Sequence, residues 1–148
     1  MNTDHYMRLK DASASRTEDH LVEICWEPPD ILPHITVHAG MPPENPVQWI
    51  TPDRVEGGRA TVSGLDAPVR YYYRLHDGNS NSVLVAERRV TMEGTVNFRD
   101  IGGYRTADGH RVKWGRVFRA DGLSRLTARD HEIFKHMGIG RVFDFRTH

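Results

Sequence analysis

The chain has 148 residues, of which 38% are hydrophobic, so it can bury the core of one ordinary domain or slightly more. Lys+Arg and Asp+Glu are equal at 20 each, which excludes a strongly basic or acidic protein, and we expect neither nucleic acid nor a membrane as partner. No apolar run approaches the ~20 residues of a membrane span, and the N-terminus lacks a signal-peptide pattern. A single cysteine cannot form an internal disulfide, which favours a reducing compartment, and we expect a cytoplasmic protein.

Residues 1–18 are polar and aperiodic, and we predict a flexible lead there, with a first edge strand as the alternative. From residue 20 onward, apolar and polar residues alternate in short runs separated by turn residues, which is typical of half-buried antiparallel strands. Such short strands at regular spacing, with no helical period between them, predict a β-sandwich. The expected strands are 20–27, 35–39, 47–50, 60–63, 69–76 and 83–90, and the expected turns are 54–59 and 77–81.

A tryptophan and a tyrosine in these runs carry a resemblance to a known domain. The V-E-I-C-W-E-P-P run around Trp26 resembles the second strand of a fibronectin type III domain, whose core holds a tryptophan. Leu65 and Tyr71 resemble the tyrosine corner of that domain. The resemblance covers residues 19–93 and implies that both aromatic side chains are buried, with the Tyr71 hydroxyl bonded to backbone near Leu65. Because neighbours on a strand face opposite ways, we expect the tyrosine run 71–73 to supply core positions plus one exposed ring.

The periodicity changes after residue 94, which indicates a second unit. Thr127 is a predicted helix N-cap with Asp130 at the reciprocal capping position, and Gly138 supplies the stop. The expected elements are a strand within 112–119, a helix over 127–137 and a strand over 141–146. A strand, a helix and a strand at this spacing predict the opening of an α/β domain with parallel strands.

Four blocks in this unit resemble a bacterial tyrosine-phosphatase family, whose members read N-F-R-D-[LIV]-G-G-Y, G-R-[LV]-[FY]-R, L-S-R-L and then a D-[LF]-R strand. The matching blocks are 97–104, 115–119, 123–127 and 142–146. The resemblance covers residues 95–148. The expected fold is therefore mostly β: an immunoglobulin/fibronectin III-like β-sandwich over 19–93, followed by the incomplete N-terminal part of an α/β cysteine-phosphatase domain.

The resemblance implies an enzyme that hydrolyses phosphate monoesters through a cysteinyl-phosphate, without metal or other cofactor. Its substrate would be a phosphorylated protein or a small phosphoester. The family's catalytic loop, H-C-x-x-G-K-D-R-[ST]-G, is expected beyond His148, so we expect a truncated catalytic domain that has no catalytic residue and is inactive alone. The alternative is a non-enzymatic sandwich module that binds a protein or peptide along an exposed strand edge.

Cys25 does not fit the nucleophile of such an enzyme. A cysteine phosphatase needs an arginine six residues after the cysteine, and here that residue is Ile31. Glu23 and Glu27 flank the thiol, and their negative charge would raise its pKa. We predict an inert thiol on a sandwich strand.

The candidate site residues come from the resembling blocks. Arg146 and Asp144 end a predicted parallel strand, where ligands bind in such sheets, and by resemblance they are candidate substrate-binding residues of a complete enzyme. The alternative for Arg146 is an ion pair with Asp144 or Asp100. Asn97, Arg99 and Asp100 lie beside a Gly-Gly turn, and we expect them to support the catalytic loop rather than contact the ligand.

Two further expectations concern metals and partners. On a strand His34 and His38 lie roughly 13 Å apart, and on a helix His131 and His136 lie on different faces, so we expect no metal site. A strand over 142–145 that is apolar on both faces needs neighbours on both sides. We therefore expect a homo-oligomer, or exchange of this segment between protomers, through the unfinished sheet, and the alternative is loss of order after about residue 94.

Overall fold

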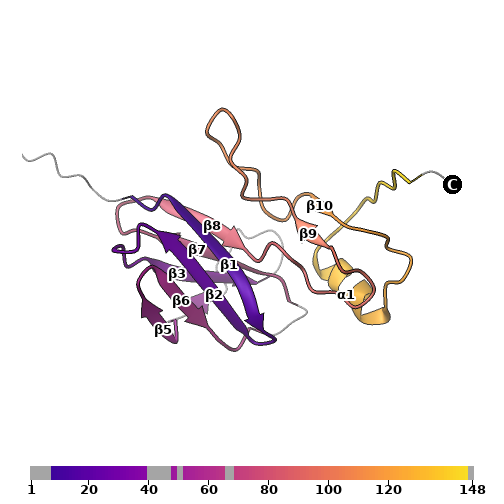
Figure 1. Cartoon of the computed structure of the whole chain (residues 1–148), viewed down its shortest axis with the longest axis horizontal. Helices are drawn as coiled ribbons and strands as arrows, with labels where there is room; N and C mark the ends of the chain where they lie inside the picture. The colour runs from indigo at the N-terminus through magenta and orange to yellow at the C-terminus, as the bar shows by residue number, and fades with distance from the viewer. Residues whose placement is uncertain (1–7, 40–47, 50–51, 66–68, 147–148) are drawn as a thin grey trace, which may run out of the picture.

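The computed structural model describes residues 8–39, 48–49, 52–65 and 69–146. Two four-stranded antiparallel sheets fill the N-terminal part, and a second part with two short strands and one helix lies beside them (Figure 1). The described chain is thus mostly β with few helical residues. No helix in the described ranges is long and apolar enough to cross a membrane.

The first sheet has the strand order β1-β2-β6-β5. Its strands are β1 (Asp11–Glu18), β2 (Leu21–Glu27), β5 (Arg54–Glu56) and β6 (Arg59–Val62). The predicted flexible lead is therefore wrong for residues 11–18, where the alternative edge strand forms, while residues 1–7 lie outside the described part. The small side chains Ala12 and Ala14 pack inward, and pairing with β2 satisfies the backbone of this polar segment. The predicted turn at 54–59 is a hairpin in which β5 already pairs with β6.

The second sheet has the strand order β4-β3-β7-β8. Its strands are β3 (His34–Ala39), β4 (Gln48–Trp49), β7 (Tyr71–His76) and β8 (Ser82–Ala86). The strand expected over 47–50 is present at its two central residues, and its ends lie outside the described part. The strand expected over 83–90 ends at Ala86, after which the chain leaves the sandwich.

A single core joins the inner faces of the two sheets, as in a sandwich-like fold. The first sheet contributes Val22, Ile24, Trp26, Ala60 and Val62, and the second contributes Ile35, Val37, Tyr73, Leu75, Val83 and Val85. Trp26 is 3% exposed, as predicted, and its indole nitrogen donates to the Ile31 carbonyl oxygen at 2.7 Å. The period-two pattern therefore places the correct face of β2 inward.

The outer face of the second sheet is buried as well, which the sequence pattern does not predict. Tyr72 is fully buried, so the expectation of one exposed tyrosine in the run 71–73 is wrong. The reason is tertiary: the Arg70 guanidinium lies 5.4 Å from the Tyr72 ring centre, and the C-terminal part packs against this face through Trp114. Tyr71 is only partly buried. Residues 66–68 lie outside the described part, so the bond from the Tyr71 hydroxyl to backbone near Leu65 stays a prediction.

The C-terminal part has its own small core. Strands β9 (Arg99–Asp100) and β10 (Phe118–Arg119) pair antiparallel, and α1 (Ala128–His136) follows. The capping box between Thr127 and Asp130 is present as predicted, and Gly138 follows the helix at φ 62°. The buried members of this core are Phe98, Ile133 and Met137. The strand predicted within 112–119 is reduced to β10.

Residues 141–146 do not form the predicted strand. Their large apolar side chains are exposed, with Val142 at 61%, Phe143 at 74% and Phe145 at 92%. A strand exists only through its neighbours, and no described strand pairs with this segment. The parallel α/β arrangement is therefore not present in the described part of the chain. The predicted oligomer or segment exchange is not tested by a single chain and stays a prediction.

Candidate functional site

Asp100 is the centre of a buried polar site in the described chain. It is 0% exposed, and its carboxylate accepts three hydrogen bonds. Oδ1 accepts from the Gly102 backbone N–H at 2.8 Å, and Oδ2 accepts from the Gly115 N–H at 2.8 Å and from Arg70 Nη2 at 2.9 Å. A buried carboxylate is tolerated only when it is paired in this way. Asp100 thus fixes both ends of the segment 102–115.

A chain of polar contacts runs from this carboxylate into the sandwich. Arg70, immediately before β7, donates to Asp100 and also to the Glu87 carbonyl oxygen. The Glu87 carboxylate accepts two bonds from Arg16 of β1, at 2.9 and 3.0 Å, and one from the Tyr73 hydroxyl at 3.1 Å. Burial and the Glu87 carboxylate raise the pKa of Tyr73, which keeps its hydroxyl protonated as a donor. The two parts of the chain therefore share one network.

Trp114 packs so closely against Gly102 and Gly103 that neither position has room for a side chain. A Cβ added at Gly102 would lie 2.5 Å from the Trp114 Cα, and one at Gly103 would lie 2.4 Å from its ring. Gly103 also has φ 79°, which favours glycine. The Trp114 indole nitrogen donates to the Leu84 carbonyl oxygen of β8 at 2.9 Å. Arg88 lies over the Trp114 ring, with its guanidinium carbon 5.0 Å from the ring centre.

The remaining motif residues have different environments. Phe98 is buried, and its ring centre lies 5.4 Å from that of Phe118 and 5.3 Å from that of Phe134. Arg99 is exposed on β9, opposite Arg119. Asn97 Oδ1 is buried and has no hydrogen-bond partner among the described residues. Of the three residues predicted to support the catalytic loop, only Asp100 accepts several buried hydrogen bonds. The loop-supporting role of Asn97, Arg99 and Asp100 stays a prediction.

Arg146 and Asp144 lie together on the exposed segment after α1. Arg146 Nε donates to Asp144 Oδ1 at 2.9 Å, and the Arg146 guanidinium also bonds Oδ2. Hydrogen bonds from Arg146 lower the pKa of Asp144 to about 2. The ion pair expected as the alternative for Arg146 is thus present, with Asp144 rather than with Asp100. Both side chains are solvent-exposed, and their substrate-binding role is not tested.

Asp130 does more than its predicted capping. Its carboxylate accepts from the Thr127 N–H at 3.0 Å, as the capping box requires, and also from the Glu93 and Gly94 N–H groups at 2.9 and 2.8 Å. Burial acts to raise the pKa of Asp130, but these backbone hydrogen bonds outweigh it and lower the pKa. The carboxylate thereby attaches the start of α1 to the segment that leaves the sandwich.

Cys25 is placed as predicted, on the sandwich strand β2. Its Sγ lies 3.7 Å from a Glu23 carboxylate oxygen. Partial burial and the Glu23 charge raise the pKa of the Cys25 thiol. Within the described ranges, no group of three or more His, Cys, Asp or Glu side chains has the geometry for a metal ion.

The raised pKa of Cys25 predicts slow alkylation of its thiol near neutral pH. At pH 7.5 Cys25 should react with iodoacetamide more slowly than free cysteine, because less of it is thiolate, and its rate should still be rising above pH 9. Mass-spectrometric alkylation at several pH values measures this rate. Glu23→Gln removes one cause of the raised pKa and should increase the rate at pH 7.5, whereas Glu132→Gln, which alters an exposed carboxylate on α1 in the C-terminal part, should not change it. A rate faster than that of free cysteine would contradict the assignment.

Comparison with known proteins identifies the class to which this C-terminal part is similar. Residues 90–148, less than half of the chain, match the sequence model described as the tyrosine phosphatase family. A curated protein of Cupriavidus necator, named "Putative tyrosine-protein phosphatase H16_A0669", is 39% identical over 51 residues. The alignment covers 34% of this chain and 19% of that relative, so the chain spans about a fifth of the relative's length. No solved structure matches the chain.

The sequence does not identify four of the residues that hold this site together. Arg16, Arg70, Glu87 and Trp114 are separated from Asp100 by between 13 and 84 positions and belong to no block of the phosphatase motif. Arg70 lies in the polar half of an alternating run, where an exposed arginine is the ordinary expectation. Only the Gly-Gly pair hints at a neighbour, since paired glycines often mark a close approach.

Proposed function

We propose that this chain is the N-terminal portion of a tyrosine-phosphatase-family hydrolase. The complete protein would cleave phosphate monoesters of a phosphorylated protein or a small phosphoester through a cysteinyl-phosphate, without metal, in the cytoplasm. Its N-terminal part would be a fibronectin type III-like sandwich. The sequence printed here has one cysteine, Cys25, without the required arginine, so the nucleophile would come from a later part of the complete enzyme.

The strongest support for this proposal is that the block that matches the family also contains the buried, hydrogen-bonded Asp100. The N-F-R-D-I-G-G-Y block lies inside the matched residues 90–148, and its aspartate carries three buried hydrogen bonds while its two glycines pack on Trp114. A motif whose buried carboxylate fixes a backbone segment by hydrogen bonds is suited to supporting a rigid catalytic loop. Asn97, Arg99 and Asp100 are proposed for this supporting role.

Strand order supports the proposal for the N-terminal part. The orders β1-β2-β6-β5 and β4-β3-β7-β8 correspond to strands A-B-E-D and C′-C-F-G of an immunoglobulin-like sandwich. Buried Trp26 on β2 occupies the position that the fibronectin resemblance assigns to the core tryptophan. Arg146 and Asp144 are proposed to face the substrate in the complete enzyme, because their exposed ion pair can open toward a phosphate.

The isolated 148-residue chain should not hydrolyse p-nitrophenyl phosphate above the buffer rate. The reason is chemical: Cys25 has a raised pKa and no arginine six residues later to hold the phosphoryl group. A colorimetric assay with the wild type and with Cys25→Ser measures this. Turnover that Cys25→Ser abolishes would overturn the assignment of Cys25 as inert.

The same assay on the product of the full reading frame tests the proposal itself. That protein should turn over p-nitrophenyl phosphate in the presence of EDTA, and changing the cysteine of an H-C-x-x-G-K-D-R segment to serine should abolish turnover. A full reading frame without such a segment would favour the second candidate, a protein- or peptide-binding sandwich. The exposed strand β5, which forms one edge of the first sheet, is the observation in favour of that candidate.

A further inference from the structure

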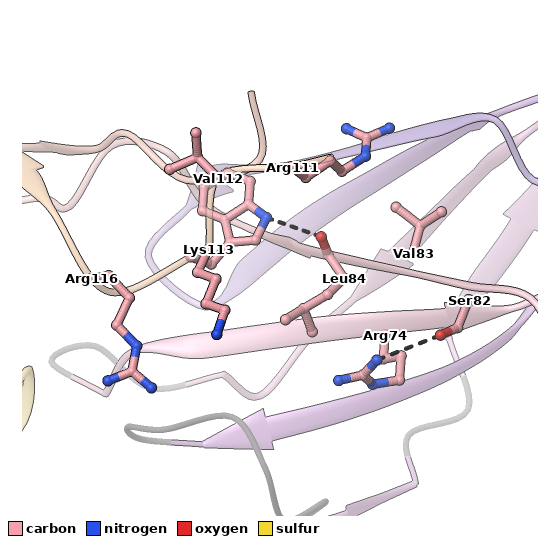
Figure 2. A pocket seen from close by; sticks show the side chains of 9 residues that line it. Arg74, Ser82, Val83, Leu84, Arg111, Val112, Lys113 and Arg116 are labelled. Atoms are coloured by element: carbon pink, nitrogen blue, oxygen red, sulfur yellow. Dashed lines mark hydrogen bonds between the residues drawn. The ribbon is translucent and has the colours of Figure 1, made fainter. Parts of the chain in front are cut away.

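A pocket of about 530 Å³ opens between the outer face of the second sheet and the segment 111–116. Figure 2 shows its side chains, with those of β7 and β8 on one side and those of the segment on the other. The lining residues are Arg74, Ser82, Val83, Leu84, Arg111, Val112, Lys113, Trp114 and Arg116. Four of them are cations and none is a carboxylate, whereas the whole chain has equal numbers of basic and acidic residues.

Three of the four cations are available to a ligand. Arg111 is already engaged: it pairs with Asp11 at 3.1 Å, and in Figure 2 its guanidinium points away from Lys113 and Arg116. Lys113 and Arg116 are exposed, and their side chains make no hydrogen bond or ion pair within the described part of the chain. Arg74 makes one long bond of 3.4 Å to the Ser82 hydroxyl. Concentrated positive charge without compensating carboxylates attracts an anion.

The two walls of the pocket are fixed relative to each other. The Trp114 indole nitrogen donates to the Leu84 carbonyl oxygen of β8, which joins the two walls. Within the segment's own wall, Arg111 Nη1 donates to the Gly103 carbonyl oxygen at 3.0 Å. Gly115, which lies between Lys113 and Arg116 in the sequence, donates its N–H to the Asp100 carboxylate, and this bond fixes the backbone that carries both cations. A ligand therefore meets cations whose backbone is already ordered, which lowers the entropic cost of binding.

The floor of the pocket is apolar. It is formed by Leu84, Val112 and Trp114, which are partly buried, whereas the Val83 side chain belongs to the sandwich core. In Figure 2 the charged ends of Lys113, Arg116 and Arg74 lie around the Leu84 side chain. This arrangement suits an anion attached to an apolar group. A small, bounded set of cations is also unlike the long basic stripe that tracks a nucleic-acid backbone.

We propose that this pocket binds a phosphate monoester carried by a peptide. The dianionic phosphoryl group would lie between Arg74, Lys113 and Arg116, where guanidinium groups can donate two hydrogen bonds each. A neighbouring apolar side chain of the peptide would contact Leu84 and Val112. The inference does not depend on the proposed phosphatase function, because it concerns binding by the chain itself and requires no turnover.

Fluorescence anisotropy with the full 148-residue chain tests the proposal. The probe is a fluorescein-labelled heptapeptide of alanine and leucine with a central phosphoserine, and the reference is the same peptide with serine. We expect the phosphorylated peptide to bind at least about tenfold more tightly, the effect of one charge-assisted hydrogen bond. Lys113→Gln/Arg116→Gln should remove at least about tenfold of that affinity, and Lys113→Gln alone should remove part of it.

The matched control is Lys135→Gln/Arg141→Gln, which removes the same net charge from exposed positions outside the pocket and should leave affinity unchanged. All variants are exposed changes, so equal melting temperatures check their folding. Equal weakening by the control pair would overturn the site, since it would indicate only a general field. If inorganic phosphate displaced the peptide with an affinity equal to that of the peptide, the peptide would not be the occupant. Tighter binding of a single-stranded oligonucleotide or of anionic lipid vesicles than of the phosphopeptide would also rule the peptide out.

Discussion

Asp100→Asn is expected to lower the free energy of unfolding by about 3–5 kcal/mol, the cost of breaking a buried ion pair by removing one partner. The change leaves Arg70, which is almost fully buried, without its carboxylate. It also turns one acceptor oxygen into an N–H₂ group. In either orientation that group faces a donor, the Gly102 N–H on one side or the Gly115 N–H and Arg70 on the other. A buried donor that loses its acceptor costs about 1–3 kcal/mol.

Urea unfolding followed by circular dichroism measures this effect. The control is Asp108→Asn, the same chemical change at an exposed turn in the neighbouring segment, where a loss well below 1 kcal/mol is expected. The double variant Arg70→Met/Asp100→Asn should cost less than the sum of its single changes, because neither then leaves an unpaired buried charge. Equal losses for Asp100→Asn and Asp108→Asn would contradict the central position of Asp100.

The part of the fold that could be predicted is the part that depends on local sequence. The alternation through Val22, Ile24 and Trp26 places one face of β2 in the core because a strand's side chains repeat every two residues. Thr127 and Asp130 define the start of α1 because the capping box is closed between residues three apart. Both signals are complete within a few positions of the chain.

The part that could not be predicted depends on contacts between distant segments. The alternating pattern predicts an exposed side chain at Tyr72, yet Tyr72 is fully buried and the Arg70 guanidinium lies over its ring. The polar residues 11–18 form a strand because they pair with β2, whereas the apolar residues 141–146 pair with no described strand. Strand formation is decided by the neighbour rather than by the hydrophobicity of the segment.

The candidate site illustrates the same limit. The motif around Asp100 is evident in the sequence, but its partner Arg70 is 30 positions away and lies in a run predicted for the sandwich. The ion pair between Asp144 and Arg146 could be predicted, as the alternative to substrate binding, because the two residues are only two positions apart. The network from Asp100 through Arg70 and Glu87 to Arg16 means that the two parts of the chain are connected by buried charge. We therefore expect damage to one part to affect the other.

Trp26→Ala should lower the free energy of unfolding by about 3–5 kcal/mol, as large aromatic truncations in cores do. The side chain is 3% exposed and packs between the two sheets, so its loss leaves a cavity. It also leaves the Ile31 carbonyl oxygen without the indole donor. Because the polar network joins this sandwich to the Asp100 site, protection of the Gly102 and Gly115 amides from hydrogen exchange should fall as well.

Chemical denaturation and amide exchange of the variant measure the two effects separately. The control is Leu32→Ala, an apolar truncation six residues along the chain at a side chain that is 77% exposed, and its cost should stay within about 0.5 kcal/mol. A Trp26→Ala protein as stable as the Leu32→Ala protein would refute the inward register of β2. Loss of stability with unchanged protection at Gly102 and Gly115 would show instead that the C-terminal part holds its structure without the sandwich, despite the Arg70–Asp100 bond.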